Sequence, residues 1–171
     1  MQSTMRQYLS DRRRFYRQWM PDHIGQCMIS EENYLTRSRL PSGEEAGVHV
    51  QTGDICWIDY GQTYLNEMGF QHFGLIIKIC YKKALVVPMT SNVSDYQKAY
   101  DPLENPEGNV CLMRLGKVEG MRKVSTLFLN DMRFINTARV FAVMAHLDVQ
   151  DPLFIEVELR LKKMLESQDF Q

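Results

Sequence analysis

The pattern of apolar and polar positions divides the chain into a helical start, a strand-rich middle and a helical end. Short apolar runs separated by turn-forming residues predict strands at 55–60, 73–81, 84–89, 110–115, 126–132 and 140–145. Short strands at close spacing are typical of a small barrel or sandwich. Lys82 and Lys83 predict the turn of a hairpin, and the polar stretch 90–108 predicts a long loop.

The first fifty residues have the spacing of helices rather than strands. Apolar residues recur at helical intervals before Pro21, namely Met5, Tyr8, Leu9, Tyr16 and Trp19. A second helix is expected from Ser30 towards Leu40, and the Pro-Ser-Gly sequence at 41–43 then breaks the chain. We therefore expect residues 1–47 to form a helical extension with a linker, and residues 48–171 to fold without it.

The end of the chain predicts one amphipathic helix. Asp151 is a suitable cap, and Pro152 suits the first helical position because its missing N–H is not needed there. The apolar stripe consists of Phe154, Val157, Leu161, Met164 and Leu165. This stripe is expected to pack against the sheet or against a second copy of the chain.

Charge and cysteine content exclude several classes of protein. Lys plus Arg is 20 and Asp plus Glu is 21, so net charge alone indicates no partner. The four cysteines include no C-x-x-C pair, and no zinc site is expected. Buried, reduced thiols are typical of a cytoplasmic protein. Neither a signal peptide nor a membrane span is indicated, since Arg12 to Arg14 precede no apolar region and no apolar run approaches ~18 residues.

Candidate chemistry lies in three polar segments beside predicted strands. The first is Asn66 to His72, the second is Pro88 to Asn92, and the third runs from Leu129 to Arg139. Loops at strand ends are where a rigid barrel presents functional side chains. These segments are therefore the first places to look for a site.

In their order along the chain, these segments resemble the MazF/PemK family of toxin endoribonucleases. The stretch 53–59, G-D-I-C-W-I-D, is similar to the family's opening strand G-D-[IV]-x-x-[VI]-D. A loop with Glu67 and Gly69 follows, and His72-Phe73 stands where the family usually has Arg-Pro. Pro-Met-Thr-Ser at 88–91 is similar to the family's P-x-T-[SA] turn, and 132–139 is similar to a later strand with two arginines. The resemblance extends from about residue 52 to 165.

The resemblance implies a mainly β (α+β) fold, an SH3-like small β-barrel with a C-terminal helix, here preceded by the helical N-terminal extension. It also implies the toxin of a toxin–antitoxin system, a sequence-selective endoribonuclease that cleaves single-stranded mRNA. The implied reaction is metal-independent attack by the ribose 2′-OH, with no cofactor. The implied partners are single-stranded RNA, a cognate antitoxin and a second copy of the chain in a homodimer.

Specific residues follow from the matched motifs. His72 and Thr90 are the candidates for contact with the scissile phosphate. A histidine can donate or accept a proton near neutrality, although it lacks the permanent bidentate grip of an arginine. The candidates for substrate binding are Glu67, Gly69, Ser91, Asp131 and Arg133. No residue is assigned to a metal.

Other interpretations of these residues stay open at this point. Glu67 could only orient its own loop, Thr90 and Ser91 could form a turn, and Asp131 could be a solvated surface residue. The basic stretch Arg114, Lys117, Arg122, Lys123, Arg133 and Arg139 could follow an RNA backbone or protect a strand edge. The whole chain could instead be a non-catalytic module that holds RNA or protein, or a structural dimer whose N-terminal helices dock on another protein.

Overall fold

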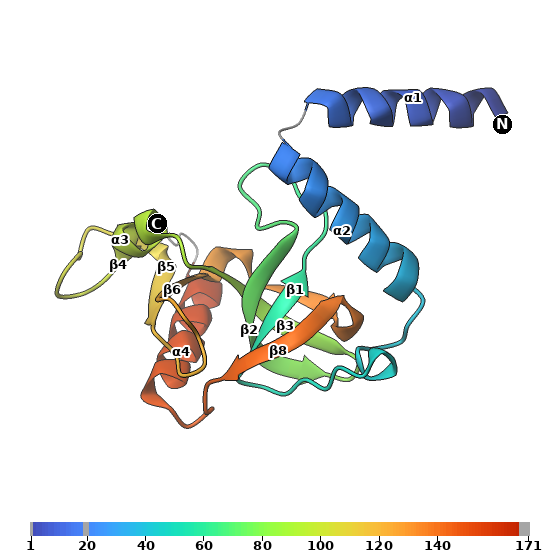
Figure 1. The fold of residues 1–171 in the computed structure, drawn as a ribbon. Helices are drawn as coiled ribbons and strands as arrows, with labels where there is room; N and C mark the ends of the chain where they lie inside the picture. The colour runs from blue at the N-terminus through green and yellow to red at the C-terminus, as the bar shows by residue number, and fades with distance from the viewer. Residues whose placement is uncertain (1, 19–20, 168–171) are drawn as a thin grey trace.

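A computed structural model describes residues 2–18 and 21–167 of the chain, and in this part the strands form one sheet (Figure 1). The strands are β1 (Asp54–Asp59), β2 (Gln71–Cys80), β3 (Lys83–Thr90), β4 (Ala99–Tyr100), β5 (Asn109–Gly116), β6 (Ser125–Phe128), β7 (Arg133–Asn136) and β8 (Val140–His146). The helices are α1 (Gln2–Gln18), α2 (Pro21–Arg37), α3 (Val93–Lys98) and α4 (Pro152–Glu166). Short 3-10 turns cover Glu44–Ala46, Leu129–Asp131 and Thr137–Arg139.

The predicted α+β class with helices at both ends is confirmed, but the sheet is not a closed barrel. Its order is β4-β5-β6-β3-β2-β1-β8, with β7 paired to the other half of β3. Strands β4 and β8 are the two ends of this order among the described strands. A barrel closes only if the first and last strands of the sheet pair with each other. The alternation of apolar and polar residues does not show which strands pair.

The central hairpin is present, with its turn one residue earlier than predicted. Cys80 pairs with Lys83, so the turn is made by Tyr81 and Lys82, and Tyr81 has a positive φ of 58°. A bulge between Ile76 and Lys78 shifts the pairing by one more residue. The turn and the bulge together set the register at the other end of the hairpin, where Phe73 pairs with Met89.

The stretch predicted as a long loop contains two short elements. Helix α3 and strand β4 lie between residues 93 and 100. The oxygen of the Asn92 side chain accepts a hydrogen bond from the Ser94 backbone at 2.9 Å and thereby caps α3. Residues 129–132 were predicted as strand, but Leu129–Asp131 form a 3-10 turn and Met132 leads into β7.

Two apolar clusters hold the fold, one on each face of the sheet. The first contains Ile55, Leu75, Met89 and Leu127, and α4 covers it with Phe154, Val157 and Leu161, as its sequence predicts. Asp151 caps α4 by accepting a hydrogen bond from the Leu153 backbone at 2.8 Å. The second cluster contains Cys56, Ile58, Tyr60, Ile76, Val86 and Val140. The polar end of this second face carries the residues considered below.

The two N-terminal helices differ in how they join the sheet. Pro21 begins α2 as well as following α1, so the second helix starts earlier than the predicted Ser30. Figure 1 shows α1 extending away from the sheet while α2 runs beside it. The predicted helical residue Trp19 lies outside the described residues. No helix in the described ranges combines the length and apolar character needed to cross a bilayer.

Helix α2 is fastened to the sheet by a buried carboxylate. Asp59 is 2% exposed and accepts hydrogen bonds from Ser30 Oγ at 2.5 Å and Asn33 Nδ2 at 2.9 Å, both from α2. It also accepts from Gln71 Nε2 and the Gly61 backbone, each at 3.1 Å. A buried charge is tolerated when its oxygens are this fully bonded.

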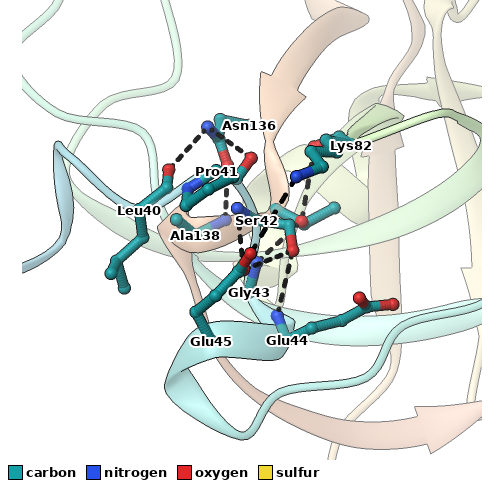
Figure 2. Close-up of polar contacts among 10 residues, drawn as sticks. Leu40, Pro41, Ser42, Gly43, Glu44, Glu45, Lys82, Asn136 and Ala138 are labelled. Atoms are coloured by element: carbon teal, nitrogen blue, oxygen red, sulfur yellow. Dashed lines mark hydrogen bonds and ion pairs between the residues drawn. The ribbon is translucent and has the colours of Figure 1, made fainter.

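The segment expected to be a polar linker is packed against β7 and its following turn (Figure 2). Ser42 and Gly43 are buried, and the Gly43 backbone donates to Thr137 Oγ1 at 2.9 Å. A side chain at position 43 would meet the Thr137 carbonyl at 2.8 Å, so glycine is required there. Asn136 Nδ2 donates to the Pro41 carbonyl at 3.2 Å.

We propose that residues 48–171 still fold alone, as the sequence predicts, but with lower stability. Removal of residues 1–20 should change the unfolding midpoint little, because the described apolar side chains of α1 are mostly exposed. Removal of residues 1–47 takes Ser30 and Asn33 away from Asp59 and should lower the midpoint by roughly 10 °C. Thermal unfolding followed by circular dichroism compares the three chains. Absence of a cooperative transition in 48–171 would reject this boundary.

Candidate functional site

His72 is oriented by the loop that precedes it. The residue lies at the start of β2, half-buried, opposite Ile58 of β1. Its Nδ1 is 2.7 Å from the Gly69 carbonyl, which can only accept, so Nδ1 carries the hydrogen. Nε2 is then the acceptor in the neutral ring and a donor in the charged ring. The imidazole is thus held in one tautomer and keeps one nitrogen for a substrate.

Thr90 lies beside His72 on the neighbouring strand. Phe73 pairs with Met89, and one further step of this register places His72 opposite Thr90. On its other side Thr90 pairs with Thr126 of β6. Directly opposed residues in antiparallel strands point to the same face, so the three side chains form one row. Thr90 Oγ1 also accepts a 3.2 Å hydrogen bond from the Asn92 backbone, so the turn interpretation holds as well.

Asp131 and Arg133 form an ion pair at the same face of the sheet. Arg133 Nη2 donates to Asp131 Oδ1, and Arg133 pairs across the strands with Val86, which belongs to the second apolar cluster. Asp131 Oδ2 accepts from the Met68 backbone and so ties down the 61–70 loop. The Asp131 side chain is 16% exposed, so it is a bonded, positioning group rather than a solvated surface residue.

Tyr60 is a buried residue that lies against Arg133 and Gly74. It is 6% exposed, and its hydroxyl lies over Gly74, where a Cβ would come within 2.1 Å of it. The guanidinium of Arg133 lies 5.4 Å from the centre of its ring. Burial raises the pKa of Tyr60 far above its ordinary value, so the phenol stays protonated. Its hydroxyl has no hydrogen-bond partner, and neither has Thr126 Oγ1.

The remaining predicted site residues are placed differently. Gly69 is buried and supplies the carbonyl that orients His72. Glu67 is exposed and accepts from the Tyr64 backbone at 3.1 Å, so it orders its own loop. Ser91 is exposed just beyond the end of β3. The structure therefore groups His72 with Thr90, and Arg133 with Asp131, while Glu67 and Ser91 lie at the margin.

The predicted basic stretch does not form one open basic surface. Arg114 pairs with Glu104 at 2.5 Å and lies 3.8 Å from Asp101. Arg133 is held by Asp131, and Arg139 donates to the Asp59 carbonyl at 3.1 Å. These half-buried arginines serve three separate places in the fold.

Within the described residues, neither the cysteine thiols nor the metal-binding residue types form a further candidate site. Burial, with a smaller contribution from Asp54, raises the pKa of the Cys56 thiol to about 12. Cys27 is buried as well, whereas Cys80 is exposed. Among residues 2–18 and 21–167, no three His, Cys, Asp or Glu side chains are grouped so that they could hold a metal ion.

Two of the grouped residues are missing from the sequence-based candidates. Tyr60 directly follows the opening strand, and alternation places it on the face of Cys56 and Ile58, which was an available signal. Thr126 has no comparable signal, because only the β3–β6 pairing brings it to Thr90. Together the grouped side chains offer a proton donor or acceptor, hydroxyl donors and one guanidinium.

Comparisons with known proteins establish the fold of this chain. Neither protein-family models nor curated proteins match the sequence. Among solved structures, MazF from Deinococcus radiodurans matches with a TM-score of 0.51 and 16% identity, over 69% of this chain and 97% of that one. A MazE–MazF structure from the same organism has a TM-score of 0.45 and 16% identity, over 68% and 95% of the two chains. The chain has the MazF-like fold that its motifs predict.

Proposed function

We propose that this chain is the toxin of a toxin–antitoxin system, a cytoplasmic, sequence-selective endoribonuclease that cleaves single-stranded mRNA. The observation that carries the proposal is the pair His72 and Thr90 at adjoining strand ends, with His72 held in one tautomer by Gly69. The MazF-like fold supports it, because the resemblance that predicted this fold also implies this activity.

The proposed step assigns a role to each grouped side chain. The ribose 2′-oxygen forms a bond to phosphorus, its proton passes to solvent, and the bond from phosphorus to the 5′-oxygen breaks. Charged His72 donates its Nε2 proton to the leaving 5′-oxygen. The Thr90 hydroxyl donates to a non-bridging phosphate oxygen, and Arg133 adds positive charge to the neighbouring substrate. The step calls for no metal ion.

Incubation of the full chain with a fluorescent single-stranded RNA tests the proposal. Fragments should appear in excess EDTA and should begin and end at a limited set of sequences. Binding of the RNA without fragments would favour the second candidate function, a non-catalytic module on the same fold. That candidate has its own support, since a histidine replaces the usual arginine and Arg133 is already paired with Asp131.

We further propose a homodimer and an antitoxin as partners. Strand β8 is an end of the sheet and exposes Val143 and Met144, by 41% and 48%. Phe154, Val157 and Leu161 of the predicted α4 stripe are buried within the chain, but Leu165 of that stripe is exposed, as are Ile155 and Leu159 of the same helix. An unpaired edge with apolar side chains is a ready surface for a second copy or an antitoxin segment.

Light scattering at micromolar concentration should give twice the mass of one chain. A stable dimer buries roughly 1,200 Å² or more, which the edge of β8 and the outer face of α4 could supply together. Val143→Lys should shift the mass towards one chain, and Val93→Lys, at an exposed site on α3, should not. A single-chain mass for the unaltered protein would contradict the dimer.

A further inference from the structure

A cavity of about 550 Å³ lies between α2 and the end of β1. One wall consists of residues of α2 together with Ser38, and the other consists of residues from 59–62 and 136–139. Cavities of this size hold small organic ligands, and one nucleotide fits within the range. Asp59 and Arg139 belong to the matched motifs, but the resemblance assigns neither of them a role in a cavity, and Tyr60 connects the cavity with Arg133.

The arginines that line the cavity outnumber its carboxylates, since Arg12, Arg37 and Arg139 occur there with Glu31 and Asp59. Arg37 lines it and donates Nη1 to the Val140 carbonyl at 2.8 Å, and Arg139 donates Nη1 to the Asp59 carbonyl at 3.1 Å. No ion pair is recorded for either guanidinium within the described chain. A guanidinium has five N–H donors, so most of those on Arg37 and Arg139 remain available. The carboxylate of Asp59 is used by the four donors described above.

An unpaired acceptor and an exposed ring lie in the same wall. Asn33 is 7% exposed and its Oδ1 has no hydrogen-bond partner, because its Nδ2 is committed to Asp59. This oxygen has less than 1 Å² of exposed surface, so Asn33 shapes the wall rather than offering an open acceptor. The neighbouring Tyr34 also lines the cavity and is 67% exposed, so its ring is open for stacking.

The charged surface continues from the cavity along α1. Two further hollows, of about 580 and 400 Å³, lie beside it, and Arg12 lines all three. Arg14 lines one of them, and Arg13 and Arg17 line the other, together with Tyr16. Helix α1 holds five arginines and one aspartate in its sequence. Arg12 is paired with Glu31 and Arg14 with Asp11, so the unpaired charge beside these hollows lies, among the described residues, on Arg13 and Arg17.

We propose that this arginine pocket, formed by Asn33, Tyr34, Arg37 and Arg139, holds one unstacked nucleotide of single-stranded RNA. The base stacks on Tyr34, while the flanking phosphates lie on Arg37 and Arg139. The arginines of α1 carry the next phosphates. The inference rests on the proposed function and deepens it, because it gives the N-terminal extension a part in choosing where RNA is cut.

Fluorescence anisotropy with the full chain and a short, fully 2′-O-methylated single-stranded RNA tests this pocket without cleavage. Tyr34→Ala should weaken binding at least about 5-fold, since a base–aromatic stack contributes that much or more. Arg37→Gln should reduce the slope of log affinity against log salt by about 0.7, the loss of one phosphate contact. Lys162→Gln, at an exposed lysine of α4, should change neither quantity.

Cleavage of unmodified RNA by the same proteins separates the two proposals. Unchanged affinity and salt slope in both Tyr34→Ala and Arg37→Gln would overturn the pocket, even if the unaltered chain cleaves RNA. Weakened binding in these variants, together with no cleavage by the unaltered chain, would support the pocket and remove the nuclease. Because Tyr34 is exposed and makes no buried contact, its variant stays informative if Arg37→Gln is unstable.

Discussion

Replacement of His72 by alanine should lower the rate of RNA cleavage by about 100- to 10,000-fold, the usual contribution of a positioned proton donor. The fold should survive, because His72 is half-buried at the start of β2 and bonds only the Gly69 carbonyl. Single-turnover cleavage of a fluorescent RNA measures the rate, and circular dichroism checks the fold. Thr90→Ala should also lower the rate, and Ser94→Ala, at an exposed position of α3, serves as the matched control. Full activity in His72→Ala would remove this residue from the mechanism.

A second variant at the same position separates positive charge from the imidazole itself. His72→Arg should retain some activity in the same assay, since arginine also brings charge and N–H donors to the scissile phosphate. Loss of activity in His72→Arg as complete as in His72→Ala would show that the step needs the imidazole rather than positive charge.

Replacement of Asp59 by alanine should cost about 3–5 kcal/mol of unfolding free energy. The change removes the acceptor of Ser30 Oγ and Asn33 Nδ2, both from α2, and so releases α2 from the sheet. Gln71 Nε2 loses one of its three acceptors and keeps the Gln26 carbonyl and Ser30 Oγ. Urea unfolding measures the loss. Glu107→Ala, at an exposed position, should change the free energy by less than about 0.5 kcal/mol. An Asp59→Ala protein as stable as its parent would show that α2 is not held by this carboxylate.

The sequence predicted the elements whose own residues determine them. Alternating apolar runs located β1, β2, β3, β5 and β8, and the cap at Asp151 located the start of α4. Helix α3 and strand β7 were missed because elements of six and four residues are too short to show a period. The opening of α2 was missed because Pro21 was taken only as a stop, although proline also suits a first helical position.

The register that brings Thr90 to the strand end beside His72 could not be predicted from the sequence. A turn at Lys82 and Lys83 with a regular ladder would set His72 opposite Val93. The observed turn lies one residue earlier, which moves each partner back by two residues, and the bulge after Ile76 moves it back by one more. Phe73 therefore pairs with Met89, and Thr90 is the next residue along β3. Both details depend on how the hairpin packs between β1 and β6, and a one-residue error moves every side chain to the other face.

The buried polar groups were the least predictable part of the site. Asp59 was seen only as the last letter of a motif, yet it joins α2 to the sheet. The unpaired oxygens of Asn33, Tyr60 and Thr126 come from three distant parts of the chain. These atoms are buried by tertiary contacts between distant segments, so no spacing in the sequence predicts them.

The chemistry of the RNA ends tests the central claim most directly. A single-stranded RNA should be cleaved by the full chain in excess EDTA, and the fragments should be analysed by mass spectrometry. Attack by the 2′-OH predicts a 2′,3′-cyclic phosphate on one fragment and a 5′-hydroxyl on the other, and no cut where the attacking ribose is 2′-O-methylated. Fragments with a 3′-hydroxyl and a 5′-phosphate, or complete inhibition by EDTA, would contradict the account.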